Sequence, residues 1–382
     1  RIIDRRGTNS IKYRFYDPDV LPLWVADMDF PAPPPVLAAL RAQVAHGIFG
    51  YEFPTEALIE TVQARLARLY TWQVTPQEVL VVPGLVSGFN VAARAVCRPG
   101  EGYLIQPPNY FPMRDLQKNT GFERREAPLA ALADGPTLRY EIDFDALAAA
   151  VRPNTRLFLL CHPHNPVGRA FTRVELEQLA EFCLRHDLII CSDEIHSELL
   201  LGDTPHLPIA TLAPEVAART ITLNSPSKTF NIAGLFCGFA IVADPELRQR
   251  FQAVTSELTL HVAAPGLVAA QAAYGPETDA WLQALRAYLT ANRDALVRYV
   301  AERLPGMRTT TPEATYLAWL DCRDLRLEPS PFEFFMRQAR VALNDGMTFG
   351  PGGEGFVRLN FGCPRATLMQ ALERMRAALA AR

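Results

Sequence analysis

Lysine is scarce in this 382-residue chain, and one lysine stands where chemistry could be done. Only Lys12, Lys118 and Lys228 occur among the 38 basic residues, and the others are arginine. A lysine amine can lose its proton and become a nucleophile or a base, whereas arginine stays charged. Lys228 lies in TLNSPSKTFNIAGL, residues 222–235, where an apolar run ends in a polar turn. Lys12, in an N-terminal arm, and Lys118, in a polar turn, are expected to be solvated, so Lys228 is the candidate catalytic lysine.

A carboxylate follows a second apolar run. Asp193 comes directly after LIICS in the segment 188–200. An acid at the end of a buried strand is costly unless a cation or a hydrogen-bond donor meets it, and the protonated ring nitrogen of a cofactor would be one such partner. An aspartate here could instead cap the next helix. Glu194 and His196 lie beside it, and both fit a structural role as well as a catalytic one.

A third polar segment, CHPHNPVGRAFT at residues 161–172, also follows an apolar run. Asn165 lies in its proline-containing turn and is a candidate donor to a cofactor oxygen. His162 and His164 have no third ligand at a metal-like spacing, so no metal site is expected. Ligands of open parallel sheets gather at the carboxyl ends of the strands. The three segments therefore indicate one ligand site.

The elements that must position these residues alternate along the chain. Nearly every position is apolar in the runs EVLVVP, GYLIQ, RLFLLC, DLIICS, RTITLN and FCGFAIV, and helical patterns separate them. Such runs are typical of strands covered on both faces. They predict an α/β fold, with a large domain at residues 45–275 whose mainly parallel central sheet is sandwiched by helices. Residues 1–44 are expected to form an arm and a helix that pack with a smaller α+β domain, which follows a long linking helix within residues 276–382.

Composition excludes several classes of function. The 38 basic and 41 acidic residues leave a net charge of −3, so no basic field for nucleic acid or for a membrane surface is expected. Seven cysteines, mostly inside apolar runs and without a Cys-x-x-Cys pair, are typical of reduced core residues in a cytoplasmic protein. No apolar run approaches 18 residues, and the start lacks the apolar core of a signal peptide. The first residue is not Met, so we expect a few N-terminal residues to be missing.

The order of three motifs, HNPVGR, SDEIH and SPSKTFNIAGL, resembles that of fold-type I pyridoxal 5′-phosphate (PLP) enzymes in the class I/II aminotransferase superfamily. The resemblance covers essentially the whole chain and implies the aspartate aminotransferase-like fold. Within the superfamily, LPLWVADMDF, the DEIH variant and VRLNFGCPR resemble the cystathionine β-lyase and cysteine C–S lyase group of the MalY/PatB type.

The resemblance implies roles around the cofactor. Lys228 would bind PLP covalently and then remove the Cα proton of the substrate, tasks that suit a desolvated amine. Asp193 would pair with the protonated pyridine nitrogen, and Asn165 would hydrogen-bond the 3′ oxygen of the ring. Tyr110 would stack on the ring, although an ordinary packed aromatic residue is equally compatible with its sequence context. His196 would lie beside the cofactor.

The phosphate of the cofactor would be held by a helix start. A glycine-containing turn opens a helical pattern in VVPGLVSGFNVAARAV, and free backbone amides at such a start bind anions. The resemblance implies that Leu85 and Val86 contribute amides and that Ser225 and Ser227 contribute hydroxyls. Many superfamily members carry an arginine eight residues after the lysine, where this chain has Phe236. The C–S lyase group shares this departure, which favours the narrower assignment.

The resemblance also implies the substrate contacts and the assembly. Arg358 would bind the α-carboxylate of an amino acid through its planar guanidinium, together with Asn165. Trp24 and Asp27 would line the substrate entrance, although no chemistry for Asp27 follows from the sequence. Tyr51 would reach the phosphate of the neighbouring subunit, so a homodimer with shared active sites is expected.

The activity that the resemblance implies is β-elimination of a sulfur leaving group. L-Cystathionine or a cysteine S-conjugate would yield a thiol, pyruvate and ammonia. An aminotransferase on the same fold is the alternative, because both reactions begin with removal of the Cα proton and every assigned residue serves that step. A catalytically silent binding or regulatory protein is a remote alternative, against which the joint presence of Lys228, Asp193 and Asn165 argues.

Overall fold

The computed structural model describes residues 2–382 and gathers the apolar runs into one seven-stranded sheet of order β2-β10-β9-β8-β7-β3-β4. Its strands are β2 (Val79–Val82), β3 (Gly102–Ile105), β4 (Glu123–Glu126), β7 (Thr155–Cys161), β8 (Ile189–Asp193), β9 (Thr220–Asn224) and β10 (Gly238–Val242). Strand β10 runs antiparallel to both of its neighbours, and the other pairs are parallel. The predicted mainly parallel sheet is confirmed.

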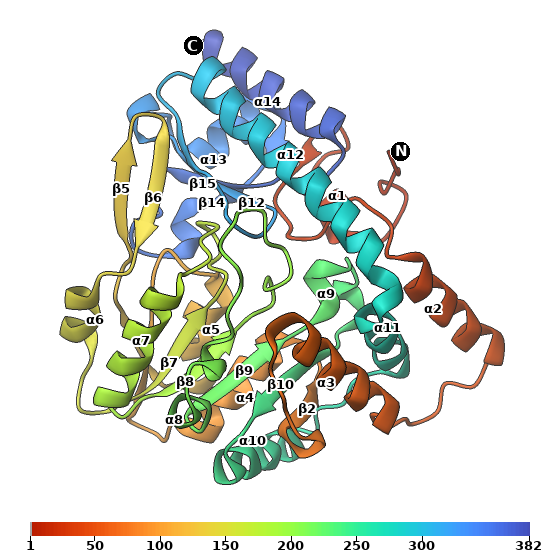
Figure 1. The fold of residues 1–382 in the computed structure, drawn as a ribbon. Helices are drawn as coiled ribbons and strands as arrows, with labels where there is room; N and C mark the ends of the chain where they lie inside the picture. The colour runs from red at the N-terminus through yellow and green to blue at the C-terminus, as the bar shows by residue number, and fades with distance from the viewer. Residues whose placement is uncertain (1) are drawn as a thin grey trace.

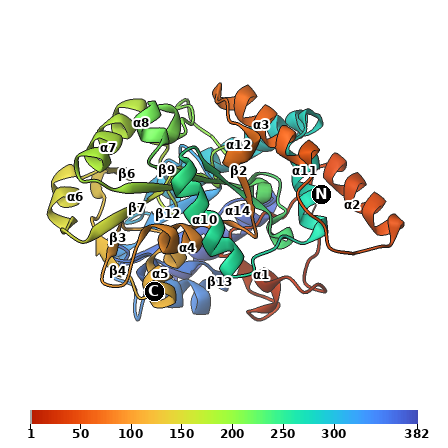
Figure 2. The same ribbon diagram turned by 90° about the horizontal axis from the view of Figure 1, so that it is seen from below.

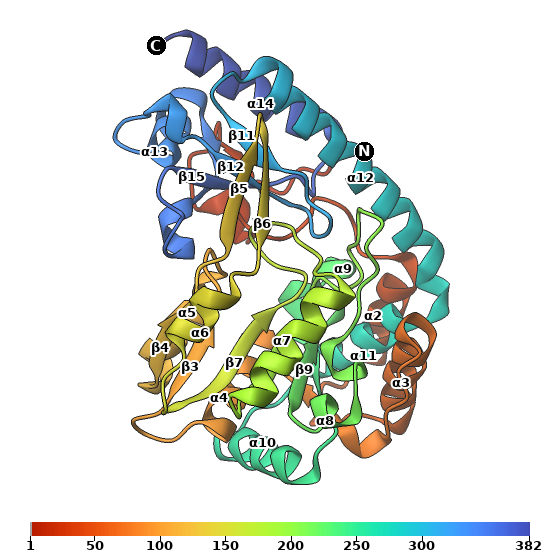
Figure 3. The ribbon, with the colours of Figure 1, turned by 60° about the vertical axis from the view of Figure 1, so that its left-hand side comes forward.

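Helices cover both faces of this sheet, which explains why its strands are apolar at nearly every position. Along β7, Leu157, Leu159 and Cys161 pack on one face, whereas Phe158 and Leu160 pack on the other. The first face is covered by α4 (Leu85–Val96), α5 (Phe111–Thr120) and α10 (Pro245–Glu257), and the second by α6 (Phe144–Ala150), α7 (Arg173–Arg185) and α8 (Pro214–Ala217). Figure 3 shows α7 lying across the strands. Because side chains alternate between the faces of a strand, burial on both faces needs an unbroken apolar run.

A second sheet belongs to the C-terminal part of the chain, with strand order β14-β15-β12-β11-β6-β5. Its strands are β5 (Ala130–Asp134), β6 (Thr137–Glu141), β11 (Arg308–Thr310), β12 (Leu317–Asp321), β14 (Asn344–Asp345) and β15 (Phe356–Asn360). The hairpin β5–β6 comes from the middle of the chain, yet β6 pairs in parallel with β11. Figures 1 and 3 show this hairpin rising from the large sheet to the C-terminal unit.

The helix predicted at the junction is α12 (Asp279–Arg303), which has 25 residues and packs against α14 (Arg365–Ala380). It runs from the side of the large sheet to the C-terminal unit (Figure 1). A short helix, α13 (Pro331–Phe334), continues as a π-helix to Ala339, in the region where a helix was expected.

The N-terminal part contacts both units. Strand β1 (Leu21–Pro22) pairs with β13 (Val341–Ala342), after the short α1 (Ile11–Arg14). Helix α2 (Pro34–His46) packs on α11 (Ala264–Tyr274), and α3 (Glu56–Tyr70) follows it. Thr55 is the expected N-cap of α3, since its side chain accepts a hydrogen bond from the Leu58 amide. The connection from α2 to α3 lies at the outer edge of the molecule (Figures 1 and 2).

Candidate active site

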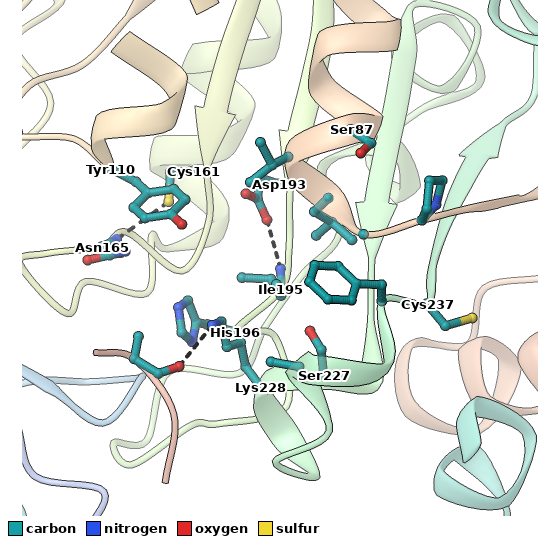
Figure 4. Close-up of a pocket in the computed structure, with 17 residues that line it drawn as sticks. Ser87, Tyr110, Cys161, Asn165, Asp193, Ile195, His196, Ser227, Lys228 and Cys237 are labelled. Carbon is teal, nitrogen blue, oxygen red and sulfur yellow. Dashed lines mark hydrogen bonds between the residues drawn. The ribbon is translucent and has the colours of Figure 1, made fainter. Parts of the chain in front are cut away.

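A cavity of about 380 Å³ lies at the carboxyl ends of β8 and β9, beside the first turn of α4. Its lining includes Asp193, Lys228, Asn165, Tyr110 and His196 (Figure 4). These residues come from four separate segments of the chain, so the fold has brought together the polar ends of apolar runs. The position agrees with the rule that open parallel sheets bind ligands at the carboxyl ends of their strands.

The amine of Lys228 points into this cavity from α9 (Pro226–Thr229), the short helix that follows β9. Its Nζ donates a hydrogen bond to the main-chain oxygen of Ala26 over 2.8 Å (Figure 4). Burial, together with the nearby Arg358 cation, lowers the pKa of Lys228 to about 8. A substantial fraction of this amine is therefore neutral near physiological pH, as a nucleophile or base requires.

Asp193, the last residue of β8, is a buried carboxylate that has only one polar contact with the chain. Its Oδ1 accepts a hydrogen bond from the Ile195 amide over 3.1 Å. No lysine, arginine or histidine within residues 2–382 forms an ion pair with it. Burial, with a smaller effect from Glu194, raises the pKa of Asp193 to about 7. A cationic group bound in the cavity would restore the ionised form.

The other end of the cavity is suited to an anion. Helix α4 begins at Leu85, and its N-cap is Gly84, which has a φ of +90° and no side chain to cap the first amides. The amides of Leu85, Val86 and Ser87 are therefore free to bind a ligand. Ser87 also lines the cavity. Ser87 was not among the predicted site residues, although it lies in the same helical turn as Leu85 and Val86, which were.

The two serines that precede the lysine differ in position. Ser227 lines the cavity. Ser225 does not, because its hydroxyl lies 2.7 Å from the main-chain oxygen of Cys237 and accepts a hydrogen bond from the Ser227 amide. Phe236, eight residues after Lys228, also lines the cavity and is mostly exposed.

A buried cation lies next to the cavity on β15. The Nη1 of Arg358 donates to Asn165 Oδ1 over 3.1 Å, and Nη2 donates to Asn344 Oδ1 over 2.6 Å and to the main-chain oxygen of Trp24 over 3.0 Å. Its Nε is buried without a partner, and no carboxylate in residues 2–382 forms an ion pair with it. Burial lowers the pKa of Arg358 to about 10. These properties fit a guanidinium that receives an external carboxylate.

Asn165, Tyr110 and His196 complete the walls. Asn165 accepts from Arg358 through Oδ1, which leaves its amide NH2 as a donor. The ring of Tyr110 lies beside Asn165 in Figure 4, at the N-cap of α5. His196 is buried with Nδ1 unpaired, and burial together with Lys228 lowers its pKa to about 3, so its imidazole is neutral. Gly168 allows the Asn165 turn to lie against Pro312, because its φ is +76° and a Cβ there would come within 2.8 Å of that proline.

Three further predicted residues lie outside the lining of the cavity. Tyr51 is fully exposed on the connection between α2 and α3. The indole of Trp24 donates to the main-chain oxygen of Lys12 over 3.2 Å, and only the main-chain oxygen of Trp24 contacts Arg358. The carboxylate of Asp27 is paired with Arg5.

The expectation that Lys12 is a solvated surface residue is wrong. Its side chain is 1% exposed, and its Nζ lies 3.0 Å from Asp29 Oδ2 and 3.4 Å from Asp27 Oδ1. The N-terminal arm folds back onto the segment that carries both aspartates, and these partners lie 15 to 17 residues further along the chain. Lys118 is exposed, as predicted, and pairs with Asp115.

Glu194, whose role the sequence left open between structure and catalysis, lies outside the lining of the cavity and is paired with a buried histidine. His206 Nε2 lies 2.8 Å from Glu194 Oε2, and the ring of His162 stacks on His206 at 4.6 Å. Burial raises the pKa of Glu194 and lowers the pKa of His206, so the uncharged forms are favoured. Glu194 therefore packs behind Asp193 as a structural neighbour.

Three findings apply to residues 2–382 as a whole and concern the cysteines, metal binding and membrane spans. All seven cysteines are buried and free, as expected for reduced core residues. Residues 2–382 contain no group of three or more His, Cys, Asp or Glu side chains arranged to hold a metal ion. Within the same residues, no helix combines the length and apolar character needed to cross a bilayer.

Comparison with known proteins gives the family of the chain. The family model described as aminotransferase class I and II matches residues 18–375. Cystathionine beta-lyase PatB of Bacillus subtilis is 38% identical over 384 residues, which cover 98% of each chain. Cystalysin of Treponema denticola, solved with a pyridoxal 5′-phosphate cofactor, is 30% identical with a TM-score of 0.95, covering 100% of this chain and 98% of that one. The PLP-bound C–S lyase of Staphylococcus hominis is 31% identical with a TM-score of 0.91 over 99% and 97%. The chain belongs to the class I and II aminotransferase family.

Proposed function

We propose that the protein is a PLP-dependent C–S lyase that eliminates a thiol from L-cystathionine or from a cysteine S-conjugate. The observation that carries the proposal is a cavity at the open first turn of α4, lined by the ionisable groups Lys228 and Asp193, with the buried cation Arg358 beside it. Relatives named cystathionine beta-lyase and structures named C–S lyase support the reaction type.

The residues of the cavity fit PLP. Asp193 would pair with the protonated pyridine nitrogen, since this carboxylate is buried and forms no ion pair with a cation of residues 2–382. The amides of the first turn of α4, with the Ser227 hydroxyl, would hold the phosphate. Ser225 would act indirectly by fixing the Ser227 turn. Asn165 would donate to the 3′ oxygen, and Tyr110 would cover the ring.

The chemistry at the substrate follows from the groups of the chain. When bound, PLP accepts the electron pair that is left at Cα after proton removal. Lys228 Nζ takes the Cα proton, for which its lowered pKa is suited. Arg358 binds the α-carboxylate, with its unpaired Nε as one donor. The C–S bond at Cβ then breaks, and its electron pair leaves with sulfur, which takes up a proton from Lys228 and departs as a thiol. The electron pair at Cα forms the Cα–Cβ double bond of aminoacrylate, which after release takes up water to give pyruvate and ammonia.

We also propose a homodimer with shared active sites in the cytoplasm. Large apolar side chains are exposed around the connection from α2 to α3, namely Val44, Ile48, Phe49, Tyr51 and Phe53. A second copy of the chain would cover this surface and bring Tyr51 to the phosphate of its partner. Seven free, buried thiols support a reducing compartment.

One experiment separates the lyase from an aminotransferase. Purified holoenzyme is mixed with L-cystathionine in the absence of any keto acid, and pyruvate and thiol are measured over many turnovers. Sustained, equimolar release is expected from the wild type and none from Lys228→Ala, while Lys118→Met serves as a surface control. Turnover that depends on an added keto acid would identify an aminotransferase and refute the lyase. Absence of any reaction, together with no covalent PLP absorbance, would indicate a silent binding protein.

A further inference from the structure

The segment of residues 24–28 supplies main-chain oxygens to the two cationic groups of the site. Arg358 donates to the oxygen of Trp24 over 3.0 Å, and Lys228 donates to the oxygen of Ala26 over 2.8 Å. Because both side chains donate to main-chain oxygens of this one segment, a shift of the segment would move the acceptors of both.

This segment is held in a tight turn. The amide of Asp27 donates to the main-chain oxygen of Val25 over 2.9 Å, which leaves the Ala26 oxygen projecting from the turn. The Tyr316 hydroxyl donates to the same oxygen over 2.9 Å. Asn360 donates to the oxygens of Val25 and Asp27. The direction of the Ala26 carbonyl is therefore set by side chains from outside the segment.

A compact group of four charges fixes the other end of the turn. Lys12 and Arg5 come from the N-terminal arm, while Asp27 lies in the segment and Asp29 directly follows it. Arg5 contacts Asp27 at 2.6 Å and Asp29 at 2.7 Å, and Lys12 contacts Asp29 at 3.0 Å. Lys12 also donates to the main-chain oxygen of Asp27 over 3.2 Å, in the residue that follows Ala26. Two cations and two carboxylates balance, so the group is electrically neutral.

We propose that Lys12 is a positioning residue for the reaction, which holds the turn so that the Ala26 oxygen orients the Lys228 amine. Lys12 is buried and touches neither the cavity lining nor Lys228, so it acts through the backbone. A misplacement of about 1 Å at a reacting group reduces rates by about a hundredfold. The proposal rests on the proposed function only in that Lys228 is the base that removes the Cα proton, a step that lyases and aminotransferases share.

The test compares Lys12→Met, Lys12→Met with Asp29→Asn, and the surface control Lys118→Met. The single variant leaves one cation, on Arg5, against two carboxylates, whereas the double variant restores neutrality but still lacks the donor to the Asp27 oxygen. Three quantities are measured: the urea midpoint of the apoenzyme, the rate at which the apoenzyme captures PLP covalently, and the isotope effect with Cα-deuterated L-cystathionine.

In the single variant we expect PLP capture to slow about tenfold and the isotope effect to rise, because amine addition and proton removal both need an oriented amine. In the double variant the urea midpoint should recover while the other two changes persist. Wild-type capture and isotope effect in the double variant would overturn the proposal, because they would mean that Lys12 serves stability alone. Capture of PLP does not depend on the substrate, so this result stays separate from failure of the lyase assignment.

Discussion

Asp193→Asn should make the stability of the apoenzyme less dependent on pH and should lower the activity of the holoenzyme. Within residues 2–382 the buried carboxylate has one amide donor and no ion-pair partner, and burial moves its pKa from 3.8 to about 7. A raised carboxyl pKa means that the folded apoenzyme binds the proton more tightly than the unfolded chain does. The corresponding stabilisation is present below pH 4 and is lost as the pH rises to about 7.

The magnitude follows from the two pKa values. A difference between 3.8 and about 7 corresponds to about 4 kcal/mol, since one pKa unit is worth about 1.4 kcal/mol. About 3 kcal/mol of this falls between pH 5 and pH 8. Asparagine does not ionise in this range. The free energy of unfolding of the wild-type apoenzyme should therefore fall more steeply over this range than that of Asp193→Asn, by about 3 kcal/mol.

Urea unfolding of both apoenzymes at pH 5 and pH 8 measures this difference, and any constant packing cost of the amide cancels from it. In the holoenzyme, Asp193→Asn should lower kcat by about a hundredfold or more, because loss of the acid that keeps the ring nitrogen protonated removes the electron sink. Asp187→Asn, on the surface, is the matched control. Equal pH slopes for the wild type and Asp193→Asn would refute the assignment of Asp193 as an uncompensated acid.

Two further predictions concern the substrate contact and the assembly. Arg358→Lys should raise KM for L-cystathionine by about ten- to a hundredfold, because one ammonium cannot replace the bidentate guanidinium. Steady-state kinetics measures this change, and an unchanged KM would contradict the contact between Arg358 and the α-carboxylate. Tyr51→Ala and Lys228→Ala should each be nearly inactive alone, but mixed subunits should regain about a quarter of wild-type activity, because half of the dimers are hybrids with one intact site. Absence of recovery after exchange of subunits would argue against sites shared between subunits.

The large sheet could be predicted because its signal is local. A strand buried on both faces is apolar throughout, so runs such as residues 155–161 identify themselves. The hairpin at residues 130–141 has no such signal, since its outer strand is largely exposed. Its place in the second sheet depends on pairing with residues 308–310, about 170 residues further along the chain. Local sequence carries no information about such a distant partner.

The residues of the site likewise divide into those with a local sequence signal and those that depend on distant partners. Asp193, Lys228 and Asn165 could be found because each follows an apolar run, and the carboxyl ends of neighbouring strands converge. Tyr316 lies in a separate part of the chain, and only folding brings its hydroxyl to the Ala26 oxygen. The residues that flank Lys12 at positions 10–14 are exposed or half-buried, so its burial could not be expected before its two aspartate partners were seen.

The two inward-facing lysines differ in what the chain provides around them. Lys12 has two carboxylates within 3.4 Å, so its charge is compensated within the protein and its role is to hold other groups in place. Within the described residues 2–382, the Lys228 amine donates one hydrogen bond, to the Ala26 oxygen, and the Arg358 cation nearby disfavours its protonated form. Burial without a counter-charge lowers the pKa of an amine and prepares it for covalent and proton-transfer chemistry, whereas burial with a counter-charge does not. The scarcity of lysine draws attention to both residues, but the supply of carboxylates distinguishes the reactive lysine from the one that positions it.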